Sequence, residues 1–296
     1  MEFDFSWQGL LQPGEANCFF DKHAQQSFQA ETTAFSVINA WWLAECCRLI
    51  YRQEEDETGN RADIKRRQLF FEAVGIRETA FWQTAQGTQC ALLTTLAGST
   101  NNSFAVLVFR GTTGLRDWYS NLRFLKTGWE GSGRVHSGFY KALQPVWAEI
   151  QAKLQTCQCP IFFTGHSLGA ALATLAAGLY PPAAVYTFGS PRVGDEKFSS
   201  ALAGIPIYRV VNNRDVVATV PQSFLGYMHT GELHHIRRNG ERIVQATAAD
   251  IKSMRRLQFS TPYPQRRFFF PPEFLTDHAP VNYVVHLERE ITARER

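Results

Sequence analysis

The sequence lacks several features that define whole classes of protein. Its six cysteines include no paired C-x-x-C spacing of the kind that binds zinc, so we expect no metal site. Residues 167–191 carry no charged side chain, but Pro181 and Pro182 interrupt that stretch. We interpret it as a buried helix, a turn and a buried strand, and we expect no transmembrane segment.

The first residues, MEFDFSWQGL, differ from a signal peptide. Acidic side chains stand where a signal peptide has a basic segment followed by an apolar run. The cysteines are read as small buried or free thiols, which are usual in a reducing compartment. We therefore expect a cytoplasmic location, with export that needs no signal peptide as the alternative.

The charge and the composition exclude further classes. The chain has 30 Lys and Arg against 27 Asp and Glu, and the resulting net charge of +3 implies no nucleic-acid partner. Hydrophobic residues make up 45% of the 296 positions, which is too apolar for a disordered chain. Because there is no internal repeat or long polar linker, we expect one domain over residues 1–296, with its oligomeric state left open.

Apolar runs alternate with helical patterns along most of the chain. Helices are predicted over residues 31–51 and about 137–155, and a helix rich in small residues begins at Leu168. Strands are predicted at the short apolar runs 89–96, 104–109, 161–163, 184–188 and 207–211. Continuous apolar strands between helices are typical of a parallel sheet covered on both faces, so the sequence predicts a doubly wound α/β fold.

Residues 231–272 differ in character from the rest of the chain. Eight basic and three acidic side chains lie between Gly231 and Phe270, and three consecutive phenylalanines, 268–270, end this stretch before two prolines. We interpret the segment as an insert. One hypothesis is that it contacts anionic lipid headgroups, because cations beside phenylalanine suit a membrane interface. The alternative is a solvated excursion on the surface.

The residues Gly165-His166-Ser167-Leu168-Gly169 match G-x-S-x-G, the pattern of a nucleophile elbow. The motif follows an apolar strand and opens a helix, which is the context that an elbow requires. Such a turn strains the serine backbone, and a Cβ at either glycine would crowd it. We therefore predict that Ser167 is a nucleophile, with an ordinary strand–helix turn as the alternative.

A serine nucleophile needs a base for its proton and an acid that orients the base, and on this scaffold the acid precedes the histidine. Asp215 stands just past the strand at 207–211, at the edge where such sheets place their sites. A turn or cap aspartate is the alternative. His278 lies on a loop before a helix that begins with Pro280, and it is one candidate among the later histidines.

Seven segments, in this order along the chain, resemble the class 3 lipases, the fungal-type triacylglycerol lipases of the α/β-hydrolase fold. They lie at 108–112 (VFRGT), 117–122 (DWYSNL), 135–139 (VHSGF), 165–169 (GHSLG), 187–194 (TFGSPRVG), 213–221 (NRDVVATVP) and 277–278 (DH). The resemblance implies that Ser167, Asp215 and His278 form a catalytic triad. It also implies an oxyanion hole made by Thr112 and the backbone N–H of Leu168, although Thr112 is alternatively a turn residue.

The family further implies a lid, here at about residues 113–124. Leu115, Trp118, Tyr119 and Leu122 fall on one apolar helical face, which would close over Ser167 in water and open onto lipid. The alternative is a helix that packs permanently on the core.

From these features we expect a serine carboxylester hydrolase, a lipase that acts on acylglycerols at an oil–water or membrane interface and uses no cofactor. A phospholipase A1 or a feruloyl-type small-ester esterase is the alternative on the same fold, because the shape of the pocket decides between them. A rival of another class is a non-catalytic lipid- or nucleic-acid-binding protein built around the basic segment.

Overall fold

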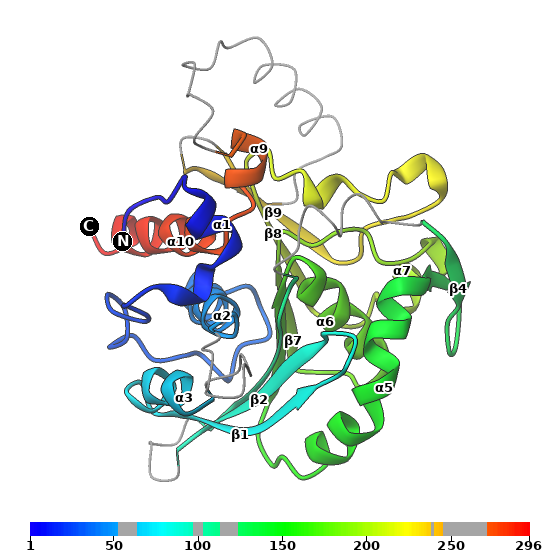
Figure 1. The fold of residues 1–296 in the computed structure, drawn as a ribbon, viewed down its shortest axis with the longest axis horizontal. Helices are drawn as coiled ribbons and strands as arrows, with labels where there is room; N and C mark the ends of the chain where they lie inside the picture. The colour runs from blue at the N-terminus through cyan, green and yellow to red at the C-terminus, as the bar shows by residue number, and fades with distance from the viewer. Residues whose placement is uncertain (53–63, 97–102, 113–123, 238–239, 245–270) are drawn as a thin grey trace.

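A sheet runs through the middle of the molecule between two layers of helices (Figure 1). The computed structural model describes residues 1–52, 64–96, 103–112, 124–237, 240–244 and 271–296. In these residues the main sheet has, in spatial order, β1 (Ile76–Gln83), β2 (Gln89–Thr95), β3 (Ala105–Phe109), β6 (Ile161–His166), β7 (Ala184–Phe188), β8 (Ile207–Asn212), β9 (Glu232–Ile236) and β10 (Arg242–Val244). A second, small sheet pairs β4 (Lys126–Gly128) with β5 (Arg134–His136).

The helices lie before, between and after these strands. They are α1 (Trp7–Leu11), α2 (Val37–Leu49), α3 (Ile64–Glu72), α5 (Ser137–Leu154), α6 (Leu168–Leu179), α7 (Glu196–Ala201), α9 (Glu273–Thr276) and α10 (Pro280–Arg294). Short 3-10 turns are η1 (Pro13–Glu15), η2 (Val217–Thr219) and η3 (Ser223–Leu225). None of the helices in the described ranges is long and apolar enough to cross a membrane.

The central strands are parallel, and their carboxyl ends meet at one edge of the sheet. β3, β6, β7, β8 and β9 pair in parallel, whereas β1, β2 and β3 pair antiparallel, as do β9 and β10. Every residue of β3, β6 and β7 is buried, which is why these strands stand in the sequence as continuous apolar runs. The predicted doubly wound α/β fold is confirmed.

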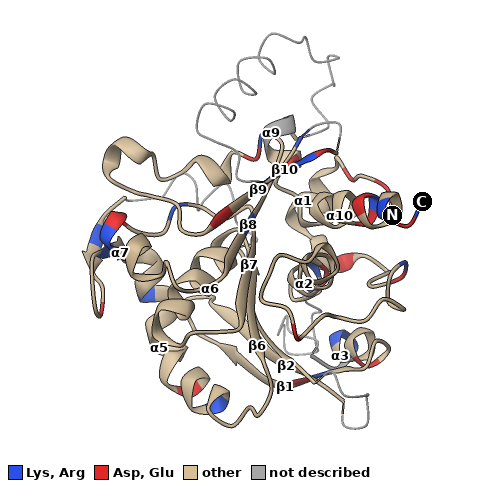
Figure 2. Ribbon diagram, turned by 180° about the vertical axis from the view of Figure 1, so that it is seen from behind, with Lys and Arg blue, Asp and Glu red and all other residues tan. Residues whose placement is uncertain are grey.

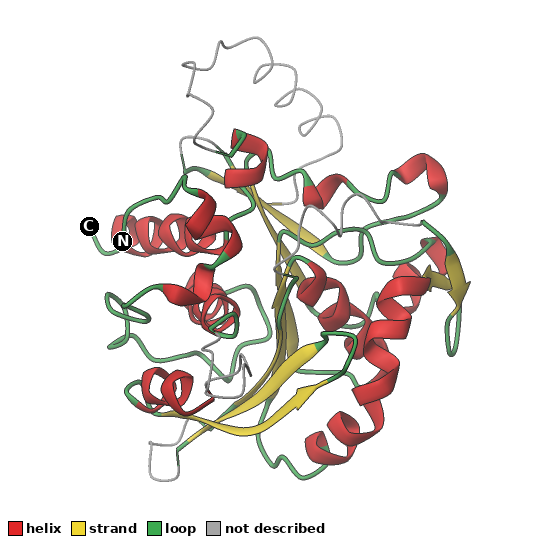
Figure 3. Cartoon of the chain, in the orientation of Figure 1, coloured by secondary structure: helices red, strands yellow, loops and turns green. Residues whose placement is uncertain are grey.

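Helices cover both faces of the sheet (Figure 3). α2 packs on β6 and on α10 at one face, and α6 packs on β6, β7 and α5 at the other. Each face therefore has its own apolar core. The central strands β6 and β7 carry no Lys, Arg, Asp or Glu, whereas the helices, the loops and the strands β1, β8, β9 and β10 do (Figure 2).

The helix predicted at 31–51 is shorter in the structure. α2 begins at Val37 because the Ser36 hydroxyl accepts a hydrogen bond of 3.2 Å from the backbone N–H of Asn39. A serine in this position satisfies one of the N–H groups that the first turn leaves free. Phe35, just before this helix, therefore packs against the core from outside it.

Part of the basic segment at 231–272 belongs to the main sheet. β9 adds to β8 in parallel, and β10 adds to β9 antiparallel. On β10, Arg242 binds the Glu290 carboxylate of α10 at 2.9 Å and lies 4.4 Å from the centre of the Phe35 ring. Residues 232–236 and 242–244 are thus strands rather than a surface excursion, and residues 245–270 lie outside the described part of the chain.

A buried ion pair on α2 holds the N-terminal segment against the core. Arg48 Nε donates to Glu45 Oε2 at 2.8 Å, and the two side chains are 1% and 0% exposed. Glu45 Oε1 also accepts from the backbone N–H of Phe20, and Arg48 Nη2 donates to the carbonyl of Cys18. Because every charge here has a partner, removing one member would leave the other buried and uncompensated.

Replacing Glu45 with Ala should lower the free energy of unfolding by about 3–5 kcal/mol, because the Arg48 guanidinium would lose its counter-charge in a dry site. The matched control is Glu241→Ala, which removes the exposed pair with Arg237 and should change stability by less than about 0.5 kcal/mol. Urea unfolding measures both values. Equal losses in the two variants would contradict this account of the α2 ion pair.

Candidate active site

Ser167 occupies a tight turn between β6 and α6. Its φ of 59° and ψ of −124° lie in a region that residues with a side chain rarely adopt. Flanking glycines make the turn possible by close approach of backbone to backbone. A Cβ at Gly165 would lie 2.2 Å from the carbonyl carbon of Gly169, and one at Gly169 would lie 2.1 Å from the Phe109 oxygen. The turn therefore has the geometry of a nucleophile elbow.

The Ser167 hydroxyl is fully buried. Within the described part of the chain its oxygen has no hydrogen-bond partner, and neither has Nε2 of His278. Two observations place these groups near each other. The Ser167 backbone N–H donates to the Phe188 carbonyl at 3.0 Å, and a Cβ on the next residue, Gly189, would lie 2.8 Å from His278 Nδ1. The imidazole of His166 lies 4.3 Å, between ring centres, from that of His278.

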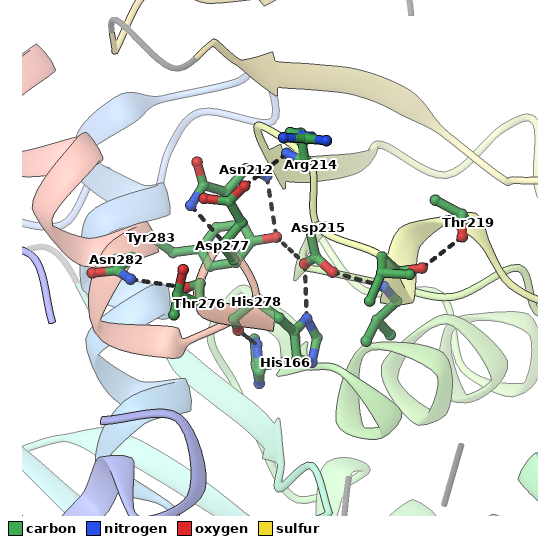
Figure 4. A network of polar contacts seen from close by, with 12 residues as sticks. His166, Asn212, Arg214, Asp215, Thr219, Thr276, Asp277, His278, Asn282 and Tyr283 are labelled. Atoms are coloured by element: carbon green, nitrogen blue, oxygen red, sulfur yellow. Dashed lines mark hydrogen bonds and ion pairs between the residues drawn. The ribbon is translucent and has the colours of Figure 1, made fainter. Parts of the chain in front are cut away.

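His278 and Asp215 form a fully buried contact (Figure 4). His278 Nδ1 lies 2.8 Å from Asp215 Oδ2. A carboxylate has no hydrogen to give, so Nδ1 donates, and in the neutral ring Nε2 is left as a hydrogen-bond acceptor. Asp215 follows β8 in a turn, where its N–H donates to the carbonyl of Asn212, and its Oδ1 accepts from the N–H of Val217 at 2.8 Å. The imidazole is thus oriented as a proton acceptor.

His166 supports the His278 loop and has no free ring nitrogen. Its Nε2 lies 2.7 Å from the His278 carbonyl, which can only accept, and its Nδ1 lies 3.1 Å from the Tyr51 hydroxyl. Burial and the neighbouring His278 hold the pKa of His166 well below 6.5. His166 therefore stays neutral, donates from Nε2 and accepts the Tyr51 proton at Nδ1.

Asp277, which precedes His278, ties two loops together. Its carboxylate accepts from Asn213 Nδ2 at 2.9 Å and from the backbone N–H of Arg214 at 3.1 Å. Its carbonyl accepts from Asn212 Nδ2 at 3.0 Å. Asp277 thus fastens the loop that carries His278 to the loop that carries Asp215, and it does not contact the imidazole through any of these bonds (Figure 4).

The residues expected at an oxyanion hole lie at the same edge of the sheet. β3 and β6 pair in parallel with Phe109 opposite Gly165. Thr112 comes three residues after Phe109, and Leu168 comes three residues after Gly165. A Cβ at Gly111 would lie 2.6 Å from the His166 carbonyl oxygen, so the backbone before Thr112 packs against the elbow. The lid residues expected from the sequence, Leu115, Trp118, Tyr119 and Leu122, lie outside the described residues.

Tyr283 is not among the residues that the sequence predicts at the site. Its hydroxyl lies 2.5 Å from Asp215 Oδ2. A tyrosine on the apolar face of an amphipathic helix is typical of an ordinary core residue, and only the packing of α10 against the end of β8 brings it to the aspartate. Within the described ranges, no group of three or more His, Cys, Asp or Glu is arranged to hold a metal ion.

Gly189→Ala should reduce the rate at which Ser167 reacts with a fluorophosphonate roughly 100-fold, because the displacement of a catalytic group by about 1 Å has this effect. Gly189 has a φ of +59°, and an added Cβ would lie 2.5 Å from Asp215 Oδ2. Gly204→Ala is the control, since its Cβ meets no atom within 4 Å. Labelling followed by mass spectrometry gives both rates; an unchanged rate for Gly189→Ala would contradict the packing described for Asp215 and His278.

The chain is similar to known lipases in sequence and in fold. The model of the family described as lipase (class 3) matches residues 106–225. A lipase of Rhizomucor miehei is 35% identical over 165 residues, 50% of this chain and 46% of that protein. A solved structure of a triacylglyceride lipase from the same organism superposes with a TM-score of 0.50 and 30% identity, over 57% of this chain and 70% of that one.

Two further relatives differ in name. A secreted mono- and diacylglycerol lipase of Fusarium solani is 37% identical over 140 residues, 42% of this chain and 41% of that protein. A chloroplastic phospholipase A1 of Arabidopsis thaliana is 34% identical over 148 residues, 39% of this chain and 33% of that protein. The chain thus spans less than half the length of the curated relatives named here.

The expected cytoplasmic location is wrong. The Fusarium relative is named as a secreted protein, and this contradicts the location expected from the first residues. That expectation used the acidic side chains among the first residues and the absence of evident disulfide pairing, and neither feature determines a compartment.

Proposed function

The chain belongs to the class 3 lipase family, and on this premise we propose that it is a serine carboxylester hydrolase, a lipase that cleaves acylglycerol esters. The observation that carries the proposal is the buried contact between His278 and Asp215 beside the strained Ser167. Ser167 Oγ and His278 Nε2 are the two atoms that would exchange the proton, and neither has a hydrogen-bond partner among the described residues.

In the proposed reaction Ser167 Oγ attacks the ester carbonyl while His278 Nε2 takes its proton. Asp215 then lies against the charged imidazole, and the water-excluded surroundings strengthen that attraction. Thr112 and the N–H of Leu168 would donate to the oxygen that becomes negative in the tetrahedral intermediate. His278 gives the proton to the leaving alcohol, and water then releases the acyl group by the reverse sequence. These steps need neither a metal nor an organic cofactor.

We also propose that residues 1–296 form one domain. The N-terminal segment is part of the same body as the C-terminal helix, because the backbone of Asp4 donates to and accepts from the side-chain amide of Asn282 on α10. β1 and β2, near the start of the chain, complete one side of the sheet that contains Ser167. These contacts favour a single unit over two independent ones.

We expect the protein to act at an oil–water or membrane interface, and we propose that residues 113–124 form its lid. Exchanging both Trp118 and Leu122 for Ser should abolish any jump in rate at a lipid interface, because the apolar face that meets lipid is then lost. The rate on a dissolved ester serves as the control and should stay near that of the unmodified protein. A rate jump that survives both exchanges would refute the lid.

Hydrolysis of tributyrin, measured through its solubility limit, tests the proposed function. The rate of ester cleavage should jump once the tributyrin concentration exceeds its solubility limit. Ser167→Ala should reduce this rate at least about 1,000-fold because the nucleophile is gone. Ser199→Ala is the control, since its hydroxyl donates to the His229 carbonyl on another part of the surface, and its activity should be unchanged.

The other outcomes separate the alternatives. Smooth saturation below the solubility limit would identify a soluble-ester esterase that uses the same serine. Cleavage of phosphatidylcholine in preference to tributyrin would identify a phospholipase A1, which the name of the Arabidopsis relative makes the second candidate. Equal activity of the Ser167→Ala variant on every ester would refute the proposed nucleophile.

A further inference from the structure

Tyr283 is a buried side chain that the reaction described above does not use. It lies in the first turns of α10, five residues after His278, and its side chain is inaccessible to solvent. Its hydroxyl lies 2.5 Å from Asp215 Oδ2, the oxygen that also accepts from His278 Nδ1 at 2.8 Å (Figure 4). One carboxylate oxygen therefore faces both the tyrosine and the imidazole.

The direction of this hydrogen bond follows from its neighbours. The backbone N–H of Asn212 donates to the Tyr283 oxygen at 3.1 Å, so one lone pair of that oxygen is already used. The ionised Asp215 offers no hydrogen, so the tyrosine proton points to Oδ2. Burial and the charge of Asp215 raise the pKa of Tyr283 well above 10, so the hydroxyl keeps that proton.

We propose that Tyr283 is a positioning residue of the Ser167, His278 and Asp215 site: by donating to Asp215 Oδ2 it fixes the carboxylate and limits the attraction between that carboxylate and the protonated His278. This proposal rests on the proposed function, because it assigns a part in the same proton transfer. Tyr283 acts through Asp215 and touches neither the nucleophile nor the substrate.

Three donors define the orientation of the carboxylate. Val217 N–H binds Oδ1, and His278 and Tyr283 share Oδ2. Hydrogen bonds to an ionised group are stronger than neutral ones, and rotation of the carboxylate would disturb all three. A second donor on Oδ2 also takes up part of its negative charge, so less of that charge is available to an imidazolium.

The tyrosine itself is held rigidly against the strands of the elbow. Its ring meets that of Phe188 edge-on at 5.9 Å between centres, and that of His166 edge-on at 6.0 Å. Beside it on α10, Asn282 Nδ2 donates to the carbonyl of Thr276 at 2.8 Å, which closes the turn that carries His278. The segment from Thr276 to Tyr283 thus positions His278 through the backbone and Asp215 through the phenol of Tyr283.

The test compares Tyr283→Phe with Tyr186→Phe. Both hydroxyls belong to buried rings and accept from a backbone N–H, that of Asn212 or that of Ser36. They differ in what they donate to, which is Asp215 in one case and the Ala34 carbonyl in the other. Tyr186→Phe therefore reproduces the loss of a buried hydroxyl without touching the site, and urea unfolding verifies that both variants remain folded.

The readout is the pH profile of kcat/KM on dissolved p-nitrophenyl butyrate. Without the Tyr283 hydroxyl, Asp215 attracts a proton on His278 more strongly, so in Tyr283→Phe the acidic limb should move to higher pH by about one unit. kcat on the plateau should fall several-fold while KM stays unchanged, because the carboxylate is less well held. Tyr186→Phe should retain the profile of the unmodified protein. The proposal would be overturned if the pH profile of Tyr283→Phe superimposed on that of the unmodified protein. It would also be overturned if the acidic limb moved equally in both variants.

Titration of the His278 imidazole by NMR separates this proposal from the proposed function. The resonance is assigned from its loss in His278→Gln, and the experiment needs no substrate. If the unmodified protein hydrolyses no ester, the proposed function fails, yet a midpoint moved to higher pH in Tyr283→Phe alone would still support the role of Tyr283. A midpoint that is the same in both tyrosine variants would refute that role whatever the activity.

Discussion

The tight turn at Ser167 is the constraint on which the rest of the site depends. A residue with a side chain at a φ of 59° costs on the order of 1–3 kcal/mol, and the surroundings must hold it there. β6 before the turn and nearly all of α6 after it are buried, and Gly169 lies so close to the Phe109 carbonyl that no larger residue fits. The strands set the position of the turn, and the turn presents the serine at the edge where β7 and β8 also end.

Around this turn the polar side chains hydrogen-bond to one another and to the backbone. His166 is kept neutral between Tyr51 and the His278 backbone, which lets an imidazole pack 4.3 Å from another without repulsion. The Asp215 carboxylate accepts hydrogen bonds from donors that are themselves held by a helix, a turn or a ring contact. An ordered set of donors needs no reorganisation when charge appears on the imidazole, which is the physical basis of electrostatic catalysis.

The sequence predicts those parts of this arrangement that local patterns determine. β7 and the start of α6 appear where apolar runs and small residues place them, and Ser167 and Asp215 each stand at the end of such a run. Contacts between distant segments have no local signal. Tyr283 reads as a core residue of an amphipathic helix, and Asp277 reads as an ordinary loop acid, until β8 and α10 are seen together. The charges of residues 232–244 suggest an exposed insert, yet pairing with β8 and the contact of Arg242 with Glu290 make them part of the sheet.

The central claim is that Ser167 forms a covalent bond to the acyl group of an ester, using the proton acceptor that Asp215 orients. Rapid acid quenching of the protein mixed with p-nitrophenyl butyrate, followed by peptide mass spectrometry, would trap the intermediate. The account predicts a butyryl group on the peptide that contains Ser167, formed at a rate no slower than turnover. Ester hydrolysis without such an adduct, or an adduct on any other residue, would contradict it.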